Sequence, residues 1–253
     1  MHSRRLRRTI ALASETLSAR IESFWNHPRL AEVYPEFLFA TYGVLCASTP
    51  LMVAAADEAG VRSASDELAR TLEPYLREHA QEEAGHDEWL LGDLAFCGIA
   101  RERVLERIPY PSVATMVGTG YYWARHVHPV AFLGYLAVLE NPASPAYLES
   151  VLARTGLPAE AMSTHMRHAR LDVTHVAEFD AMLDELPLSQ HHIDLLTTSA
   201  ITAVVHLDAF FADVLTHFDR IADLSMSHTI FTMKPSARPV ARAATETASL
   251  SVV

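Results

Sequence analysis

Basic residues, cysteine and glycine are scarce in this chain, and each shortage argues against a class of protein. Lys234 is the only lysine, and 31 acidic residues outnumber 20 basic ones for a formal net charge of −11. This balance argues against nucleic acid or an anionic membrane as a partner. The two cysteines, Cys46 and Cys97, lack metal or redox spacing and predict buried free thiols in a reducing cytoplasm. Only nine glycines in a half-hydrophobic chain favour helices over sheets.

A long uncharged run, residues 37–56, has the length of a membrane span. Polar residues and Pro50 interrupt it, which favours a buried helix of a soluble protein instead. The basic start RRLRR is followed by an apolar run that Glu15 ends too early for a signal peptide. We therefore expect a cytoplasmic protein without a membrane partner.

Apolar residues recur at helical spacing along most of the chain and predict an all-α protein of seven to nine helices. No linker or internal repeat divides residues 1–233, which we expect to form one domain. Residues 234–253 lack aromatics and helical periodicity, so we expect a disordered tail. Proline, glycine and capping residues set the expected boundaries. We predict helices at residues 9–25, 35–58, 129–141, 145–155, 158–186 and 189–221. Another predicted helix begins at a cap, Ser63 or Ser65, and ends at Gly98, and a further one includes the sequence YYW at 121–123.

Titratable side chains gather in the predicted helix that ends at Gly98. His79, Glu82 and Glu83 precede His86 by seven, four and three residues. In a continuous helix this spacing lets all four side chains share one face.

A later predicted helix carries a second titratable group in the sequence HMRHARLDVTH. At about 100° per residue, His168, Asp172 and His175 fall within roughly a 60° arc of one helix face, with His165 at its edge. A third helix contributes one carboxylate, Glu140, at the end of the apolar run VAFLGYLAVL.

Each of these patterns has an ordinary explanation by itself, such as a solvated helix face or a hydrogen-bonded core histidine. Together they are harder to explain, because unpaired buried carboxylates are costly. Arg167 and Arg170 point away from the face that carries His168. A pair of bound metal ions is therefore a simpler way to neutralise the charge of the buried carboxylates. Imidazole and carboxylate without thiolate are typical ligands of iron or manganese. Helical bundles build dinuclear sites from such residues on facing helices.

This set of motifs resembles that of the haem-oxygenase-like diiron oxidases, also called iron-containing redox enzymes. The resemblance covers about residues 30–225 and depends on EEAGHDEWLL, GYLAVLEN and HARLDVTH, whose order and spacing agree with the family pattern. It implies a haem-oxygenase-like bundle of about seven core helices, without haem, and two Fe2+ ions that activate O2. The implied metal ligands are Glu83, His86, Glu140, His168, Asp172 and His175, with His79 and Glu82 as alternates or as partners of the ligands.

The same resemblance implies an oxidase or oxygenase that acts on a small amino-acid-like or fatty-acid-like substrate in natural-product biosynthesis. The reaction would be N-oxygenation, desaturation or carbon–carbon cleavage, with an external electron donor, and a homodimer is left open. Arg125 is a candidate for binding a substrate carboxylate, and Phe132 and Leu136 are candidates for the pocket wall. Two alternatives remain. One is a metal-independent enzyme of the same fold, related to thiaminase or pyrroloquinoline-quinone synthase. The other is a non-catalytic iron-binding helical protein.

Overall fold

The structure is a computed structural model that describes residues 1–140 and 143–232. Within the helices, the side chains of Asp172, Val173 and the residues after Arg220 lie outside the described part. Internal contacts divide the chain into the units Met1–Phe218 and Asp219–Val253, and the candidate site belongs to the first. The expected disordered tail, 234–253, lies outside the described residues.

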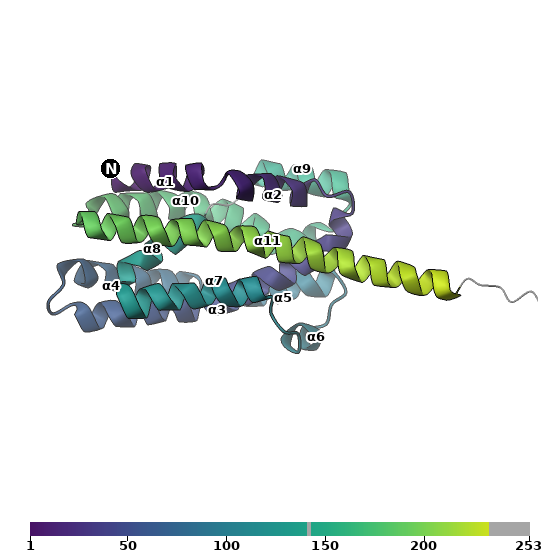
Figure 1. Ribbon diagram of the computed structural model, residues 1–253, viewed down its shortest axis with the longest axis horizontal. Helices are drawn as coiled ribbons and strands as arrows, with labels where there is room; N and C mark the ends of the chain where they lie inside the picture. Colours follow the sequence, from purple (N-terminus) through teal and green to yellow (C-terminus); the bar gives the residue numbers. More distant parts are fainter. Residues whose placement is uncertain (141–142, 233–253) are drawn as a thin grey trace, which may run out of the picture. The chain divides into compact units, whose positions relative to one another are not determined.

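The described residues form helices and no strand, which confirms the all-α prediction (Figure 1). Three short segments are not α-helical: the π-helical turn Trp123–Val127 and the 3₁₀ turns Pro129–Ala131 and Ala159–Met162. The α-helices are α1 His2–Ala13, α2 Glu15–Trp25, α3 Leu30–Arg62, α4 Glu67–Glu82, α5 His86–Phe96, α6 Arg101–Leu105, α7 Pro111–Tyr122, α8 Phe132–Leu139, α9 Pro145–Thr155, α10 Ser163–Glu185 and α11 Gln190–Thr232.

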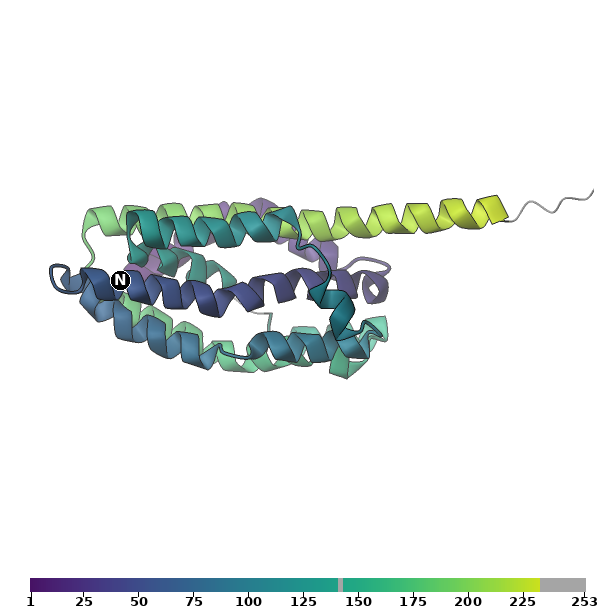
Figure 2. The ribbon, with the colours of Figure 1, turned by 90° about the horizontal axis from the view of Figure 1, so that it is seen from below.

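Helix α3 is central to the unit Met1–Phe218 and packs against α4, α5 and α7. In Figure 2 it runs between α7 and α11 on one side and α4 and α5 on the other. Its Leu38 and Leu51 are fully buried. By length and composition alone, α3 and α11 could each cross a membrane, a test that the core helix of a soluble protein also passes. The buried leucines of α3 account for its apolar sequence.

Several predicted boundaries differ from the observed ones. The expected helix 9–25 is two helices, α1 and α2, separated at Ser14, whose hydroxyl donates to the carbonyl of Ile10. The helix expected at 129–141 begins as a 3₁₀ turn and ends at Leu139, so that Glu140 lies just beyond its last turn. The cysteines are free, as predicted, but Cys46 is exposed and Cys97 only half-buried.

Candidate metal centre

The chain turns sharply between α4 and α5, inside the motif EEAGH. α4 ends at Glu82, Glu83 follows as its cap, and His86 is the first residue of α5. Gly85 makes this turn with a φ of 89°, a left-handed conformation that favours glycine. The turn brings the Oε2 atom of Glu83 within 2.8 Å of Nδ1 of His86. The prediction that these residues share one face of a continuous helix is therefore wrong, because the helix stops between them.

Asp93 fastens the start of α10 to α5. Its carboxylate is buried and accepts hydrogen bonds from the hydroxyl of Ser163, at 2.6 Å, and the backbone N–H of Thr164, at 2.9 Å. The bond satisfies one of the first N–H groups of α10, that of Thr164, and together with the Ser163 bond it holds the start of this helix beside α5. As a result, the rings of His86 and His168 lie 4.8 Å apart, although 82 residues separate them in the sequence. Our sequence analysis missed Asp93; its only signal was a carboxylate within the apolar stretch LLGDLAF.

Glu83, His86 and His168 form a compact group that could hold a metal ion. One ligand atom from each lies within 4.8 Å of the other two. Burial opposes ionisation of Glu83, but the hydrogen bond from His86 and the charges of nearby histidines bring its pKa below the usual value. Burial lowers the pKa of His168, and the charge of Glu83 opposes this only in part. At neutral pH the group therefore offers an ionised carboxylate and a neutral imidazole, which are the metal-binding forms.

A second group joins His79, Glu140 and His175. Nε2 of His79 lies 2.5 Å from Oε1 of Glu140, and the rings of His79 and His175 are 5.6 Å apart. Burial would lower the pKa of His79, but the hydrogen bond and charge of Glu140, with the charges of Glu83 and Glu82, raise it overall. Glu82 is 45% exposed and reaches only Nδ1 of His79, at 3.4 Å, so it lies at the rim of this group.

Glu140 has one oxygen without a partner. Its Oε2 atom is buried and makes no hydrogen bond to any described residue. A buried carboxylate oxygen in this condition is rare, because the lost solvation is normally replaced by a donor or a cation. The unpartnered oxygen, together with the imidazole and carboxylate donors around it, fits a bound metal ion.

The two groups lie close to each other. The charge of Glu83 raises the pKa of His79, and the charge of His79 lowers that of Glu83. Five of the six ligands predicted from the sequence thus belong to two neighbouring groups, with His79 added to the second. The sixth, Asp172, belongs to α10 one turn after His168, but its side chain lies outside the described residues.

Aromatic rings hold the histidines in place. The indole of Trp89 stacks on His86 with 3.9 Å between ring centroids, and the guanidinium of Arg167 lies over the same indole. The ring of Tyr75 is nearly parallel to that of His79, at 5.8 Å. These contacts restrict rotation of the imidazoles, so the donor atoms are oriented before any ion binds.

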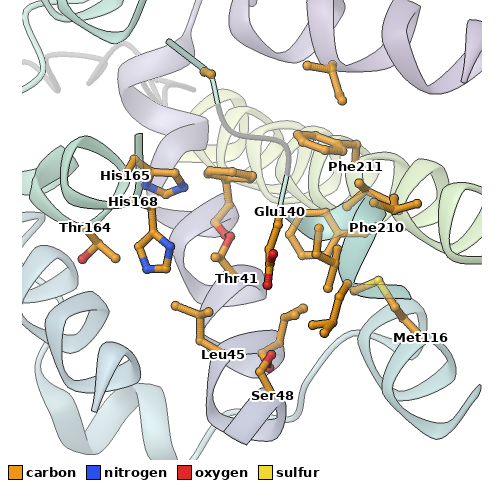
Figure 3. Close-up of a pocket in the computed structure, with 18 of the residues that line it drawn as sticks. Thr41, Leu45, Ser48, Met116, Glu140, Thr164, His165, His168, Phe210 and Phe211 are labelled. Atoms are coloured by element: carbon orange, nitrogen blue, oxygen red, sulfur yellow. Dashed lines mark hydrogen bonds between the residues drawn. The ribbon is translucent and has the colours of Figure 1, made fainter. Parts of the chain in front are cut away.

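A cavity of about 580 Å³ opens beside the two groups (Figure 3). His168, Glu83 and Glu140 contribute to its lining, and apolar side chains from α3, α7, α8 and α11 form most of the remaining wall. In Figure 3, His165 and His168 lie on one side of Glu140, and Met116, Phe210 and Phe211 lie on the other. The apolar lining includes Phe37, Val44, Leu45, Met52, Met116, Leu136, Val138, Leu207, Phe210 and Phe211.

Of the three candidate substrate contacts, the structure places one at the cavity. Leu136 lines it, whereas Phe132 packs in the core, stacked on Tyr135 at 5.4 Å. Arg125 belongs to the π-helical turn and is exposed, with its guanidinium over the ring of Tyr121. The expected carboxylate-binding role of Arg125 is therefore not supported, because the turn directs the side chain to solvent. No arginine or lysine is among the described residues that line the cavity.

Comparison with known proteins identifies a matching family and solved structures of similar fold. Residues 45–208 match the sequence pattern of a family described as iron-containing redox enzyme. A domain of unknown function with a haem oxygenase-like fold from Shewanella denitrificans is similar with a TM-score of 0.71 and 21% identity, over 92% of this chain and 96% of that one. A TenA homologue from Pseudomonas syringae pv. tomato has a TM-score of 0.64 and 11% identity, over 84% of this chain and 92% of that one. A TenA homologue from P. horikoshii has a TM-score of 0.60 and 15% identity, over 85% of this chain and 98% of that one. No curated protein matches the chain. The structural matches establish the fold alone.

Proposed function

Because this chain belongs to the family of iron-containing redox enzymes, we propose that it is an O2-dependent oxidase or oxygenase with two non-haem iron ions. The observation that carries the proposal is the pair of adjoining groups, Glu83 with His86 and His168, and His79 with Glu140 and His175. Each group supplies imidazole and carboxylate, which suit iron. Asp172, one turn after His168 on α10, completes the proposed ligand set. When bound, ferrous iron would supply electrons for the reduction of O2.

The chain's own residues would serve this reaction in two ways. Glu83 and Glu140 supply negative charge that offsets the charge of the metal ions, which a buried site needs. The ring contacts of Trp89 and Tyr75 hold His86 and His79 in their binding orientation. Orientation of ligands by their neighbours adds to the affinity of metal sites.

The cavity suggests the kind of substrate. Its volume of about 580 Å³ fits a small molecule, and most of its wall is apolar. We propose a small, largely apolar substrate that lies beside the side chains of His168 and Glu140. The electrons for repeated turnover would come from an external donor.

Metal analysis tests the proposal directly. The protein would be loaded with Fe2+ without oxygen, desalted and analysed for iron by elemental analysis and Mössbauer spectroscopy. We expect about two ions per chain, because the two groups together offer more ligands than one octahedral ion with an open position can use. A single mononuclear site would contradict the dinuclear proposal. His175→Ala should lower the iron content, because it removes one proposed ligand. His191→Ala, at an exposed histidine outside the two groups, is the control and should leave the iron content unchanged.

A second candidate function follows from the same hydrogen bonds. His79 with Glu140, and His86 with Glu83, are imidazole–carboxylate pairs at 2.5 and 2.8 Å, a geometry suited to general acid–base catalysis without metal. Full activity of the protein after chelation of iron would favour this candidate. Iron binding without O2 consumption in the presence of any substrate would favour an iron-binding protein that is not an enzyme.

A further inference from the structure

Tyr34 and His165 form a hydrogen-bonded pair at the wall of the cavity. Tyr34, on α3, is fully buried, and its hydroxyl lies 3.0 Å from Nδ1 of His165, on α10. No other hydrogen bond to this hydroxyl is made by a described residue. His165 stacks on the ring of Phe37 at 5.1 Å and meets the indole of Trp25 edge-on at 6.5 Å. The imidazole is therefore held on three sides by aromatic rings.

The buried hydroxyl determines which nitrogen of His165 carries the proton. If Nδ1 carried it, Tyr34 would accept the bond and its own O–H would remain buried without an acceptor, which is costly. If Tyr34 donates to Nδ1, every polar hydrogen of the pair except one is satisfied. The remaining one is the proton on Nε2. The pair therefore favours the tautomer in which Nε2 is a donor.

His165 also stays neutral at physiological pH. Burial, with a smaller effect of the charge on His168, lowers the pKa of His165 to about 3. A neutral imidazole of fixed tautomer offers one N–H to whatever occupies the cavity that it lines. Two hydroxyls of the lining are engaged elsewhere: Thr41 donates to the carbonyl of Phe37, and Ser48 to that of Val44. The hydroxyl of Thr164, which is buried without a hydrogen bond to a described residue, is a second donor beside His165.

We propose that Nε2–H of His165 donates a hydrogen bond to an acceptor oxygen of the bound substrate, and that Tyr34 is the residue that fixes this donor. The proposal rests on the proposed function only in assuming that the cavity is the substrate site. It names the substrate class as an apolar molecule with an oxygen that accepts a hydrogen bond. That oxygen would lie one helical turn from His168, since residues 165 and 168 are neighbours on one face of α10.

Nitrogen NMR of the metal-free protein tests the tautomer. Long-range ¹H–¹⁵N spectra distinguish the protonated from the unprotonated ring nitrogen, and the His165→Gln variant identifies the signals of His165 by their loss. We expect a protonated Nε2 in the wild type and a mixture of tautomers in Tyr34→Phe. A protonated Nδ1 in the wild type would overturn the proposal. A merely structural role of Tyr34 would leave the tautomer unchanged in Tyr34→Phe, and this result would also overturn it.

Binding of two probes of equal shape tests the donor. 2-Octanone carries a carbonyl oxygen, whereas 2-methyl-1-octene replaces that oxygen with a methylene group. Each is titrated into metal-free protein and followed by the indole N–H signal of Trp25, which lines the cavity. We expect His165→Phe to weaken binding of 2-octanone roughly 2- to 10-fold, as the loss of one hydrogen bond predicts, without weakening binding of the alkene. His165→Gln keeps an N–H donor and should retain much of the preference.

Equal losses for both probes in His165→Phe, or no binding of 2-octanone to the wild type, would overturn the proposal. Neither measurement involves iron. A failure here is therefore distinguishable from a failure of the dinuclear proposal, which iron stoichiometry tests.

Discussion

The turn at Gly85 connects backbone conformation to metal binding in a way that one substitution can measure. Gly85 has a φ of 89°, and a Cβ atom at this position would meet no atom within 4 Å. The cost of Gly85→Ala is therefore backbone strain alone, about 1–2 kcal/mol for a left-handed residue. Because Gly85 directly precedes His86 and follows Glu83 by two residues, relief of this strain would move those two side chains apart.

The strain must lower either the free energy of unfolding of the metal-free protein or the free energy gained on binding iron. If the variant keeps the turn, its free energy of unfolding without metal falls by the full amount. If it relaxes the turn, stability is retained, but iron binding must restore the strained turn and weakens by up to the same amount, about 5- to 30-fold. We expect the sum of the two losses to be about 1–2 kcal/mol, with a measurable part in iron affinity.

A matched control lies thirteen residues further on. Gly98 has a φ of 80°, equally open surroundings, and a position after the end of α5, away from the ligands. Gly98→Ala should lose the same stability in urea denaturation and leave Fe2+ affinity unchanged in anaerobic titrations. If Gly85→Ala matches the wild type in both measurements, the left-handed turn is not what brings Glu83 and His86 together.

Three further predictions concern single side chains. His175→Ala should lose one of the two proposed ions and substrate-dependent O2 consumption while the helical circular dichroism stays intact; normal turnover would mean that His175 only packs. Because the pKa of His79 is raised on folding, its proton stabilises the metal-free protein below the ordinary histidine pKa of about 6.5, and this contribution is lost as the pH rises through the raised value. The stability difference between wild type and His79→Gln should shrink over that pH range, and a constant difference would refute it. Asp93→Ala should cost about 1–3 kcal/mol of unfolding free energy by leaving the first turn of α10 uncapped, and Asp93→Asn, which keeps one acceptor oxygen, should cost less; equal losses would mean that the cap is unimportant.

Local signals in the sequence were enough to predict an all-α protein and several of its helix boundaries. Helical periodicity and the proline and glycine positions predicted α9 between Ser144 and Gly156, and the structure agrees: Ser144 accepts from the backbone N–H of Tyr147, and Gly156 ends the helix with a φ of 70°. These features depend on neighbours a few residues away, so they can be predicted without knowing the fold.

The pairing of the ligands could not be predicted in the same way. Spacing alone put His79 and His86 on one face, but the break at Gly85 separates them, and His79 meets Glu140 whereas His86 meets His168. The position of Arg125 could not be predicted either, because the π-helical turn Trp123–Val127 directs this side chain to solvent.

By itself, then, the sequence determined that this chain is helical and that imidazoles and carboxylates lie on several of its helices, because both properties follow from residue type and short-range spacing. Only the tertiary structure decided that His79 meets Glu140, that Asp93 fixes α10 against α5, and that Tyr34 meets His165 at the cavity wall. Each of these contacts joins residues at least 60 positions apart. Their formation depends on how whole helices pack, which short-range spacing does not encode.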